Sequence, residues 1–230
     1  MEPGDIISYL DMCRAEGVSL QRGMNFRLRG GLSVILMSVA PSAPYTDRVQ
    51  DDGRVLIYEG HDARRTDDAP DPKSVDQPMR TPSGGLTQNG LFYEAAERPK
   101  AGAGETELVR VYEKIRSGIW VYNGMFRLVD AWRESDGRRH VFRFKLELAE
   151  QADAQARAGE PDLAHTRLIP TSVKLEVWRR DRGRCVLCGS ADNLHFDHII
   201  PYSKGGSSLV AGNIQLLCAR HNLEKRDSIV

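Results

Sequence analysis

The sequence predicts an α+β protein in two parts, a large β-rich domain followed by a small domain held together by a metal ion. Strand-like segments rich in β-branched and aromatic residues dominate residues 1–148. A stretch rich in Ala, Glu and Gln at residues 149–164 predicts a linker, and residues 165–230 form the second domain. Three of the four cysteines lie within the last 46 residues. A length of 230 residues allows one large domain or two modest ones.

The expected elements of the first domain begin with a short amphipathic helix. Residues 4–16 place Ile6, Ile7, Leu10 and Cys13 at helical spacing. Residues 59–84 are rich in Asp, Arg, Pro and Gly and predict a long excursion from the sheet. Residues 86–97 predict a helix. Strands are expected over residues 32–39, 54–58, 108–113, 119–132 and 140–148, the last with clear alternation.

The second domain has a different pattern. Pro170 and the two hydroxyl residues after it can start and cap a helix that runs to about Asp181. A Cys-x2-Cys turn follows, and a Gly-rich turn separates two further strands. These strands are expected over residues 194–200 and 213–217, and a final helix is expected from Ala219.

Charge and hydropathy exclude several classes of protein. The chain has 32 basic and 32 acidic side chains, but residues 164–230 carry 10 Lys/Arg against 6 Asp/Glu, a weak indication of phosphate contact. The longest apolar stretch, residues 32–40, is too short to span a membrane. The start, MEPGDIISYL, lacks the pattern of a secretory signal, so a cytoplasmic protein is expected.

Two pairs of residues predict a structural zinc site. Cys185-x2-Cys188 and Cys218-x2-His221 are separated by 29 residues. Two tight pairs that fold back onto one ion supply the four ligands of a tetrahedral zinc site. In a reducing compartment such a cluster indicates metal binding before a disulfide. Because so short a segment has little core of its own, the zinc would contribute much of its stability.

Inside this frame lies an Asp-His pair. Asp197 and His198 belong to an expected strand, and Asn213 and Asn222 follow later in the frame. Asp197 and the Asn222 amide offer oxygen atoms, which hard divalent cations prefer. His198 has a side chain whose ordinary pKa suits proton abstraction from water near pH 7.

This C-terminal stretch resembles the HNH nuclease family, whose ββα-metal fold has two strands and a helix around one catalytic metal ion. The matching segments, VWRRDRGRCVLCG, FDHIIPYSKGG, NIQLLC and the closing helix, span about 55 residues. The resemblance implies that His198 is the general base, that Asp197 binds the catalytic metal, and that Asn213 braces the turn between strand and helix.

The family's common ending, Cys-x2-Cys-His, is replaced here by Cys218-x2-His221-Asn222. His221 then falls on the fourth zinc position and Asn222 on the last catalytic-metal position, which makes the chain an HNN variant with a Cys3His zinc site. A competing assignment gives His221 to the catalytic metal and leaves zinc with three ligands.

The first domain is similar to the SRA (YDG) domain, a PUA-like reader that flips modified cytosine out of DNA. Each matching segment is short, but together they keep the family's order over about 130 residues. The segments are Gly17-Val18, residues 32–36, residues 51–60 (DDGRVLIYEG), residues 86–90 (LTQNG), residues 109–111, and Tyr122-Asn123-Gly124 in place of Tyr-Asp-Gly.

The resemblance also implies a base pocket, because a flipped cytosine needs aromatic faces to stack on and an acceptor for its amine. By position, Tyr58 corresponds to one stacking tyrosine and Asp51 to the amine acceptor. Tyr45 is the nearest candidate for the second stacking residue, if an insertion before Asp51 is assumed. Residues 61–84 would correspond to the loop that enters the duplex.

The two resemblances together imply a type IV-like restriction endonuclease of a prokaryote. It would recognise 5-methyl- or 5-hydroxymethylcytosine in double-stranded DNA and hydrolyse a nearby phosphodiester. Its cofactors would be a structural Zn²⁺ and one catalytic divalent cation, Mg²⁺ or, alternatively, Mn²⁺, Co²⁺ or Ni²⁺. Because one HNH site cuts one strand, we expect a homodimer.

Two other functions fit the same residues. The first is an HNH nuclease whose N-terminal domain reads another feature, such as phosphorothioate, another base or structured RNA. The second is a non-catalytic, zinc-stabilised DNA-binding protein, against which the intact Asp197-His198 pair argues.

Overall fold

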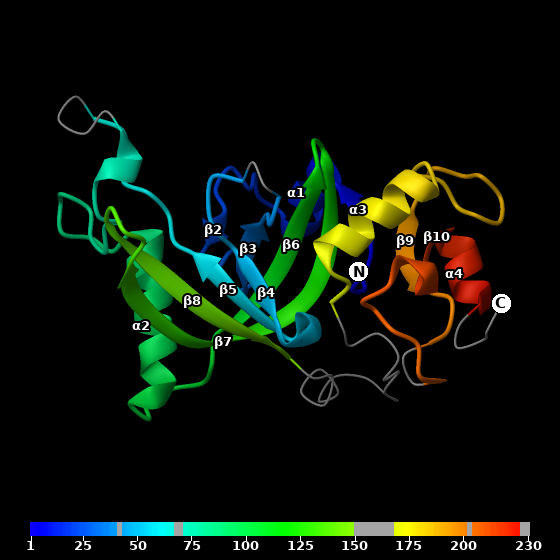
Figure 1. Cartoon of the computed structure of the whole chain (residues 1–230). Helices are drawn as coiled ribbons and strands as arrows, with labels where there is room; N and C mark the ends of the chain where they lie inside the picture. The colour runs from blue at the N-terminus through cyan, green and yellow to red at the C-terminus, as the bar shows by residue number, and fades with distance from the viewer. Residues whose placement is uncertain (41–42, 67–70, 150–167, 202–203, 226–230) are drawn as a thin grey trace.

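The computed structural model describes residues 1–40, 43–66, 71–149, 168–201 and 204–225 (Figure 1). The expected linker, residues 149–164, lies outside these ranges except for its first residue, and four residues of the expected long loop also lie outside them. Among the described residues, no helix is long and apolar enough to cross a membrane.

The N-terminal domain is built on one mixed sheet of eight strands. The strand order is β2-β3-β6-β7-β8-β5-β4, and β1 pairs with β7 off this path. All neighbours are antiparallel except β3 and β6, which run parallel. The strands are β1 (Ile6–Ser8), β2 (Met24–Asn25), β3 (Ser33–Met37), β4 (Arg48–Gln50), β5 (Val55–Glu59), β6 (Leu108–Arg116), β7 (Ile119–Ser135) and β8 (His140–Leu148).

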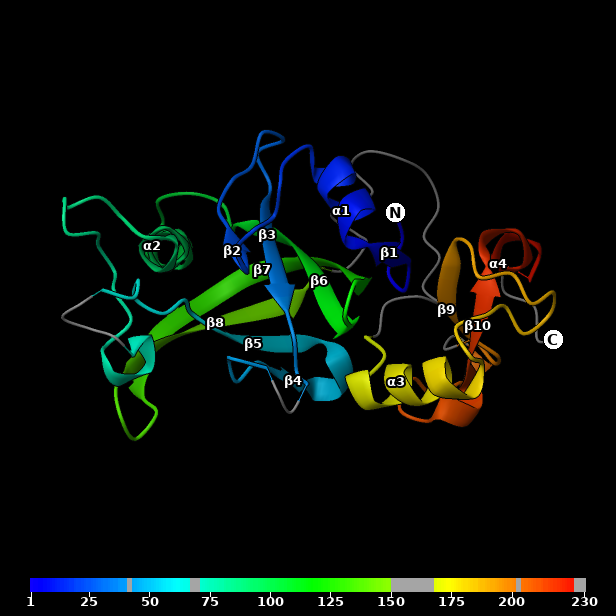
Figure 2. The same cartoon turned by 90° about the horizontal axis from the view of Figure 1, so that it is seen from above.

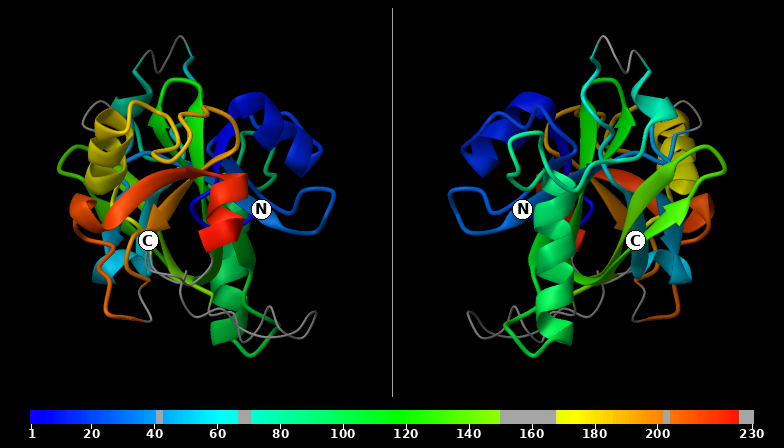
Figure 3. Two further views of the ribbon diagram at one scale, coloured as in Figure 1. Left: turned by 90° about the vertical axis from the view of Figure 1, so that its right-hand side faces the viewer. Right: turned by 90° about the vertical axis from the view of Figure 1, so that its left-hand side faces the viewer.

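Two helices pack against this sheet. Helix α2 (Gln88–Lys100) places Phe92 and Ala96 in the main core, among buried side chains of β3 and β5 to β8. Helix α1 (Tyr9–Glu16) places Met12 in a smaller core with Tyr112 and Tyr122. Figure 2 and the right-hand view of Figure 3 show α2 at the end of the domain remote from the C-terminal elements.

The expected strands and helices of this domain are present, with one correction at the N-terminus. Residues 6–8 form β1 rather than the first turn of a helix, because the Ser8 side chain accepts the Asp11 N–H and so fixes the start of α1 at Tyr9. Leu10, expected on the buried face, is 65% exposed, whereas Met12 is buried. The short strands β1, β2 and β4 were not expected.

The C-terminal domain is a small α+β module. Helix α3 (Thr171–Arg180) precedes an antiparallel pair, β9 (Leu194–His198) and β10 (Ile214–Cys218), and α4 (Ala219–Lys225) follows directly after β10. The left-hand view of Figure 3 shows this module at the front of the molecule. The expected α+β fold class, a β-rich domain followed by an HNH-type module, is therefore confirmed.

The two domains share a hydrophobic core. Ile115 of β6 and Val121 of β7 pack in the same cluster as Val173 and Val177 of α3 and Leu216 of β10. The main chain also joins them, because the Phe196 N–H of β9 donates to the Gly4 carbonyl at 3.1 Å. The domains are thus in direct contact through side chains and main chain.

Candidate functional site

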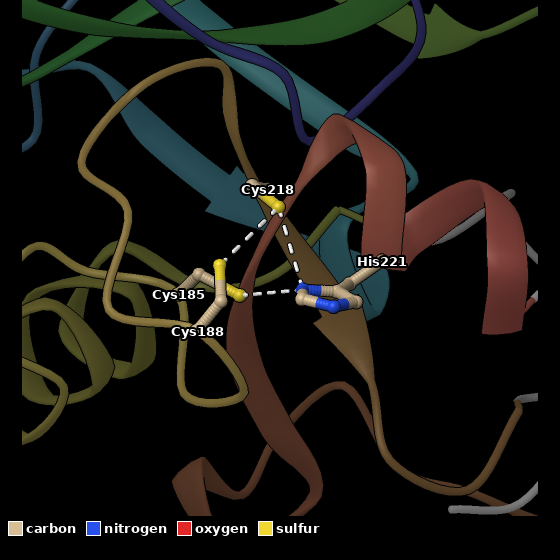
Figure 4. A group of neighbouring side chains, drawn as sticks. All are labelled: Cys185, Cys188, Cys218 and His221. Atoms are coloured by element: carbon tan, nitrogen blue, oxygen red, sulfur yellow. Dashed lines mark hydrogen bonds between the residues drawn. The ribbon is translucent and has the colours of Figure 1, made fainter.

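Four side chains of the C-terminal domain converge on one point (Figure 4). Nδ1 of His221 lies 3.3 Å from Sγ of Cys185 and 3.5 Å from Sγ of Cys218, and the Cys188 and Cys218 sulfurs are 3.8 Å apart. All four donor atoms lie within 4.8 Å of one another. Donors around a tetrahedral zinc, with bonds of about 2.0–2.3 Å, would be about 3.5–3.8 Å apart. The cluster therefore fits a zinc ion.

Local structure places the zinc donors. Cys185 and Cys188 lie in a tight turn in which the Gly189 N–H donates to the Cys185 carbonyl, and Gly189 has a positive φ of 75°. Cys218 is the last residue of β10, and His221 lies in the first turn of α4. Burial raises the pKa of the Cys185 thiol, but hydrogen bonds from the Cys218 and Cys188 amides and from His221 bring it to about 6. Cys185 thus favours the metal-binding thiolate form.

His198 ends β9 and is buried. Its Nε2 shares a 2.8 Å hydrogen bond with Oγ of Ser208, which is also buried. Since β9 pairs with β10 up to the partners His198 and Ile214, the imidazole is held at the end of a two-stranded sheet. A histidine fixed in this way can exchange a proton at a defined point in space.

Asp197 is held by two donors. Its Oδ2 accepts hydrogen bonds from Nε2 of Gln215 at 3.1 Å and from Nζ of Lys225 at 2.6 Å. The Lys225 ammonium also donates to the main-chain carbonyl of His198. Lys225 is buried, so it is not the exposed phosphate contact that a basic residue at a helix end indicates. It instead fixes the strand that carries both Asp197 and His198.

Asn213 ties the loop between β9 and β10. Its Oδ1 accepts the Ile200 N–H at 2.8 Å, and its Nδ2 donates to the carbonyls of Ile200 and Ser207 at 3.0 and 3.1 Å. A Cβ at Gly206 would lie 1.8 Å from the Ile200 carbonyl oxygen, so only glycine allows this close approach. Asn222 lies half-buried on α4, one residue after the zinc-facing His221.

The N-terminal domain contains a cavity of about 560 Å³. Tyr45 and Tyr58 line it together with Asp47. Two cationic side chains, Arg22 and Lys114, also line it. The cavity thus combines aromatic walls, an acceptor and positive charge, which is a suitable environment for a nucleotide base and its phosphate.

The two tyrosines differ in their exposure. Tyr58 lies on β5 and is 1% exposed. A Cβ at Gly23, directly before β2, would lie 2.5 Å from the Tyr58 hydroxyl, so only glycine fits at that position. Tyr45 is half-buried, and its ring stacks on His61 at 6.0 Å between centroids. Nζ of Lys73, a residue of the same 61–84 loop as His61, lies 4.5 Å from the centroid of the Tyr45 ring, at cation–π distance. Tyr45 is therefore held in place by side chains from the loop expected to enter DNA.

Asp47 lines this cavity, whereas Asp51 is not among the lining residues. Asp51 begins a 3-10 turn, residues 51–53, after β4 and is exposed, and it is absent from the cavity lining. Asp47 precedes β4, and its two oxygens accept the Glu59 and Ser38 amides at 3.1 Å each. Burial raises the pKa of Asp47 to about 7, although these amides and Arg143 oppose the shift.

The sequence alone does not single out Asp47, and it indicates Lys225 as a DNA-backbone contact rather than as the buried partner of Asp197. Asp47 and Asp51 both lie in the polar segment around residues 48–50, so no local signal separates the two carboxylates. Nothing local marks Lys225, whose partner Asp197 is 28 residues away.

Comparison with known proteins agrees with this two-part structure. A family model described as SAD/SRA domain matches residues 1–151, and one described as HNH endonuclease matches residues 185–228. No curated protein matches the chain in sequence.

Three solved structures are similar to the chain. An SRA domain of SUVH5 in a complex with hemi-methylated CG DNA is 25% identical, with 71% of this chain and 93% of that chain covered and a TM-score of 0.45. Arabidopsis thaliana SUVH6 in a complex with SAM is 21% identical, with 76% and 28% covered and a TM-score of 0.44. The Type IV phosphorothioation-dependent restriction endonuclease ScoMcrA is 16% identical, with 99% and 55% covered and a TM-score of 0.43.

The SAD/SRA match spans well over half of the chain, and the HNH match covers the module that holds the Cys3His cluster and the Asp197-His198 pair. The chain therefore belongs to the SAD/SRA domain family and carries an HNH endonuclease domain at its C-terminal side.

Proposed function

We propose that the protein is a modification-dependent DNA endonuclease, a cytoplasmic restriction enzyme of a prokaryote. One observation carries the proposal: a single chain joins a cavity with aromatic walls and a carboxylate to a nuclease module with a buried histidine at a strand end. The first part would select the DNA, and the second would cut it.

In this proposal a modified cytosine enters the cavity of the SRA domain. Tyr45 would stack on the flipped base, since stacking on an aromatic ring offsets part of the cost of unstacking the base from DNA. Tyr58 lines the cavity but is only 1% exposed, so it would bound the pocket and offer little of its ring for stacking. Asp47 would accept a hydrogen bond from the exocyclic amine, which distinguishes cytosine from thymine. Asp47 thus takes the role that sequence alone assigned to Asp51. The substrate class is 5-methyl- or 5-hydroxymethylcytosine in double-stranded DNA.

In the nuclease module His198 would take the proton from the attacking water, while Ser208 holds its ring in place. Asp197 and Asn222 would hold one divalent cation, Mg²⁺ or alternatively Mn²⁺, Co²⁺ or Ni²⁺, because hard divalent cations prefer oxygen ligands such as a carboxylate and an amide carbonyl. When bound, the cation would supply charge neutralisation at the scissile phosphate and the leaving oxygen. Asn213 would brace the turn that carries this site, and the products would have 5′-phosphate and 3′-hydroxyl ends.

Cleavage of matched duplexes tests the proposal. One DNA sequence is prepared with plain, 5-methyl-, 5-hydroxymethyl- or phosphorothioate-modified sites and incubated with the protein and Mg²⁺. We expect cleavage of the two modified-cytosine duplexes only. Cleavage of the phosphorothioate duplex alone would assign the N-terminal domain to another feature, and binding without any metal-dependent cleavage would indicate a zinc-stabilised DNA-binding protein.

We also propose a homodimer as the active form. One HNH site cuts one strand, and a two-fold axis would present two sites to the antiparallel strands of a duplex. Light scattering with and without modified DNA measures the state directly. A particle of 25.7 kDa in both samples, together with products that are nicks only, would contradict the dimer.

A further inference from the structure

The β6–β7 hairpin has one face on the base cavity and the other on the nuclease module. Lys114 of β6 and Trp120 of β7 line the cavity. Their neighbours in sequence, Ile115 and Val121, pack in the core that contains α3, β9 and β10. Since successive side chains of a strand point to opposite faces, one two-stranded wall separates the cavity from the nuclease.

A buried polar cluster fastens α3 to this wall. We name Glu113, Asn123, Thr171 and Lys174 the interdomain latch. Nζ of Lys174 on α3 lies 2.5 Å from Oε2 of Glu113 and 2.7 Å from Oδ1 of Asn123. Thr171 Oγ1 donates to the other Glu113 oxygen, and Asn123 Nδ2 donates to Glu113 Oε2 at 3.0 Å. All four side chains are buried, and Glu113 is fully so.

The latch explains the asparagine in the Tyr122-Asn123-Gly124 segment. The Asn123 side-chain amide donates through Nδ2 to Glu113 and accepts through Oδ1 from Lys174. An aspartate there could accept from Lys174 but would place a second carboxylate against Glu113, where like charges repel in a buried site. Asparagine at position 123 can therefore bind Glu113 and Lys174 of the nuclease module at the same time.

A second tie joins the modules outside the latch. Asp5, in the segment before β1, lies 2.5 Å from Nδ1 of His195 on β9, and the two residues also form a β-bridge. The Tyr122 N–H donates to the Asp5 carbonyl, so this tie acts on β7 one residue before Asn123 of the latch. The nuclease is thus held to the wall at two points.

We propose that Lys174 is a positioning residue, which through the interdomain latch holds the nuclease module at one fixed spacing from the base cavity. Cleavage then falls at one defined distance from the recognised base. A buried ion pair with two further hydrogen bonds allows few geometries, because each displacement leaves a charged or polar atom without its partner. The inference rests on the proposed function, since it assumes that the cavity selects the base and that the nuclease cuts.

The test uses the full-length, zinc-loaded protein and a duplex with a single modified cytosine. Lys174→Met breaks the latch and leaves Glu113 with an uncompensated buried charge. The double variant Glu113→Gln, Lys174→Met removes both charges and keeps the side-chain volumes, so it remains testable if the single variant does not fold. Lys100→Met is the matched control, because Lys100 makes exposed ion pairs with Glu97 and Asp130 inside the reader domain.

Two readouts are measured, the positions of the cuts on both strands and the number of thermal unfolding transitions. For the wild type and Lys100→Met we expect one main cut position and one transition. For the double variant we expect unchanged affinity for modified DNA and two unfolding transitions. Its cuts should spread over neighbouring phosphodiesters, and the cleavage rate at the main position should fall on the order of 10²-fold below that of the wild type, as for a misplaced catalytic group.

A folded double variant with a cut pattern as narrow as that of the wild type and a single transition would overturn the positioning role. If the wild type binds but does not cut the modified duplex, the proposed function fails instead. In that case the unfolding transitions still test the latch: a single transition in the double variant, as in the wild type, would contradict it.

Discussion

The reader domain and the nuclease module are stabilised in different ways. The reader has a large core in which aromatic side chains from α2, β5, β7 and β8 pack together. The nuclease core is small and includes Cys185 and Cys218 of the zinc cluster. Ile115 and Val121 of the reader sheet pack in the same core. We therefore expect the reader to fold by burial of apolar surface alone, and the nuclease module to need both a metal ion and contact with the reader.

Their buried charges differ in the same way. In the reader, Glu59 is bound by Arg143 at 3.1 Å, and both belong to adjacent strands of one sheet. In the nuclease, Asp197 is bound by Lys225 from a different element, the last helix. Loss of α4 would therefore remove the partner of Asp197 on β9, whereas the ion pair of the reader depends on the sheet itself.

Removal of a zinc ligand should have the largest effect, and it should affect the stability of the nuclease module but not that of the reader. We expect Cys218→Ser to lose its zinc and unfold the nuclease module, because zinc binding contributes on the order of 10 kcal/mol to the folding of such modules. The reader should keep its fold and its affinity for modified DNA. Metal analysis and thermal denaturation measure the two effects.

Cys13→Ser is the matched control, since Cys13 lies in the reader, away from the zinc cluster. Full zinc content and unchanged stability in Cys218→Ser would show that the ligand set is wrong. Simultaneous unfolding of the reader would show that the two domains do not differ as described.

Replacement of His198, the proposed general base, should slow cleavage without weakening the recognition of modified DNA. We expect His198→Ala to slow cleavage about 10²–10⁴-fold, the usual contribution of a general base, with unchanged affinity for modified DNA. Rates of single-turnover cleavage and equilibrium binding to the same duplex measure this. The exposed His140 provides the control His140→Ala, which should behave as the wild type. Full activity of His198→Ala would exclude it as the base.

The dependence of reader stability on pH should change when Asp47 is replaced. Its pKa is raised to about 7, so between pH 4 and 7 the folded state binds the proton that the unfolded state has released, and this group's contribution to stability falls as pH rises. His61 acts in the opposite direction, because burial lowers its pKa to about 4. Between pH 4 and 6.5 the two slopes oppose each other.

We therefore expect Asp47→Asn to become more stable relative to the wild type as pH rises from 4 to 7, by up to about 4 kcal/mol. Urea denaturation of both proteins at several pH values gives this difference, in which effects of acid on the zinc site cancel. His61→Gln should show the opposite sign. A difference between Asp47→Asn and the wild type that does not vary with pH would refute the raised pKa.

Changes in the cavity should reduce discrimination by smaller amounts. We expect Tyr45→Ala to lose about 1–3 kcal/mol of preference for modified over plain DNA, the worth of one stacking face. Asp47→Ala should also reduce this preference, whereas Asp51→Ala, outside the cavity lining, should not. Competition binding with matched duplexes measures all three. A loss in Asp51→Ala alone would return the acceptor role to Asp51.

Much of this protein was predictable because the decisive signals are local. The spacing of Cys185, Cys188, Cys218 and His221 indicates a zinc frame wherever the chain goes, since tight pairs bring two ligands together in any fold. The long strands β6 to β8 carry enough residues for alternation to be seen. The family resemblances rested on the same local segments.

Other features depended on how distant segments meet. The strands β1, β2 and β4 have only two or three residues each, too few for a period of two to appear. Asp47 and Asp51 lie at opposite ends of β4, and which of them lines the cavity depends on which end of the strand faces it. The chain on either side of β4 looks equally polar in sequence, so only the fold could decide it.

The parts of the protein can be recognised in its amino-acid sequence: a β-rich SRA domain, a Cys3His frame and an Asp-His pair within an HNH pattern. How these parts are fastened to one another is visible only in the folded chain. It paired Lys174 with Glu113 across 61 residues and Lys225 with Asp197 across 28. The physical reason is that a buried charge needs a partner close in space, and proximity in space between distant segments is set by packing rather than by local pattern.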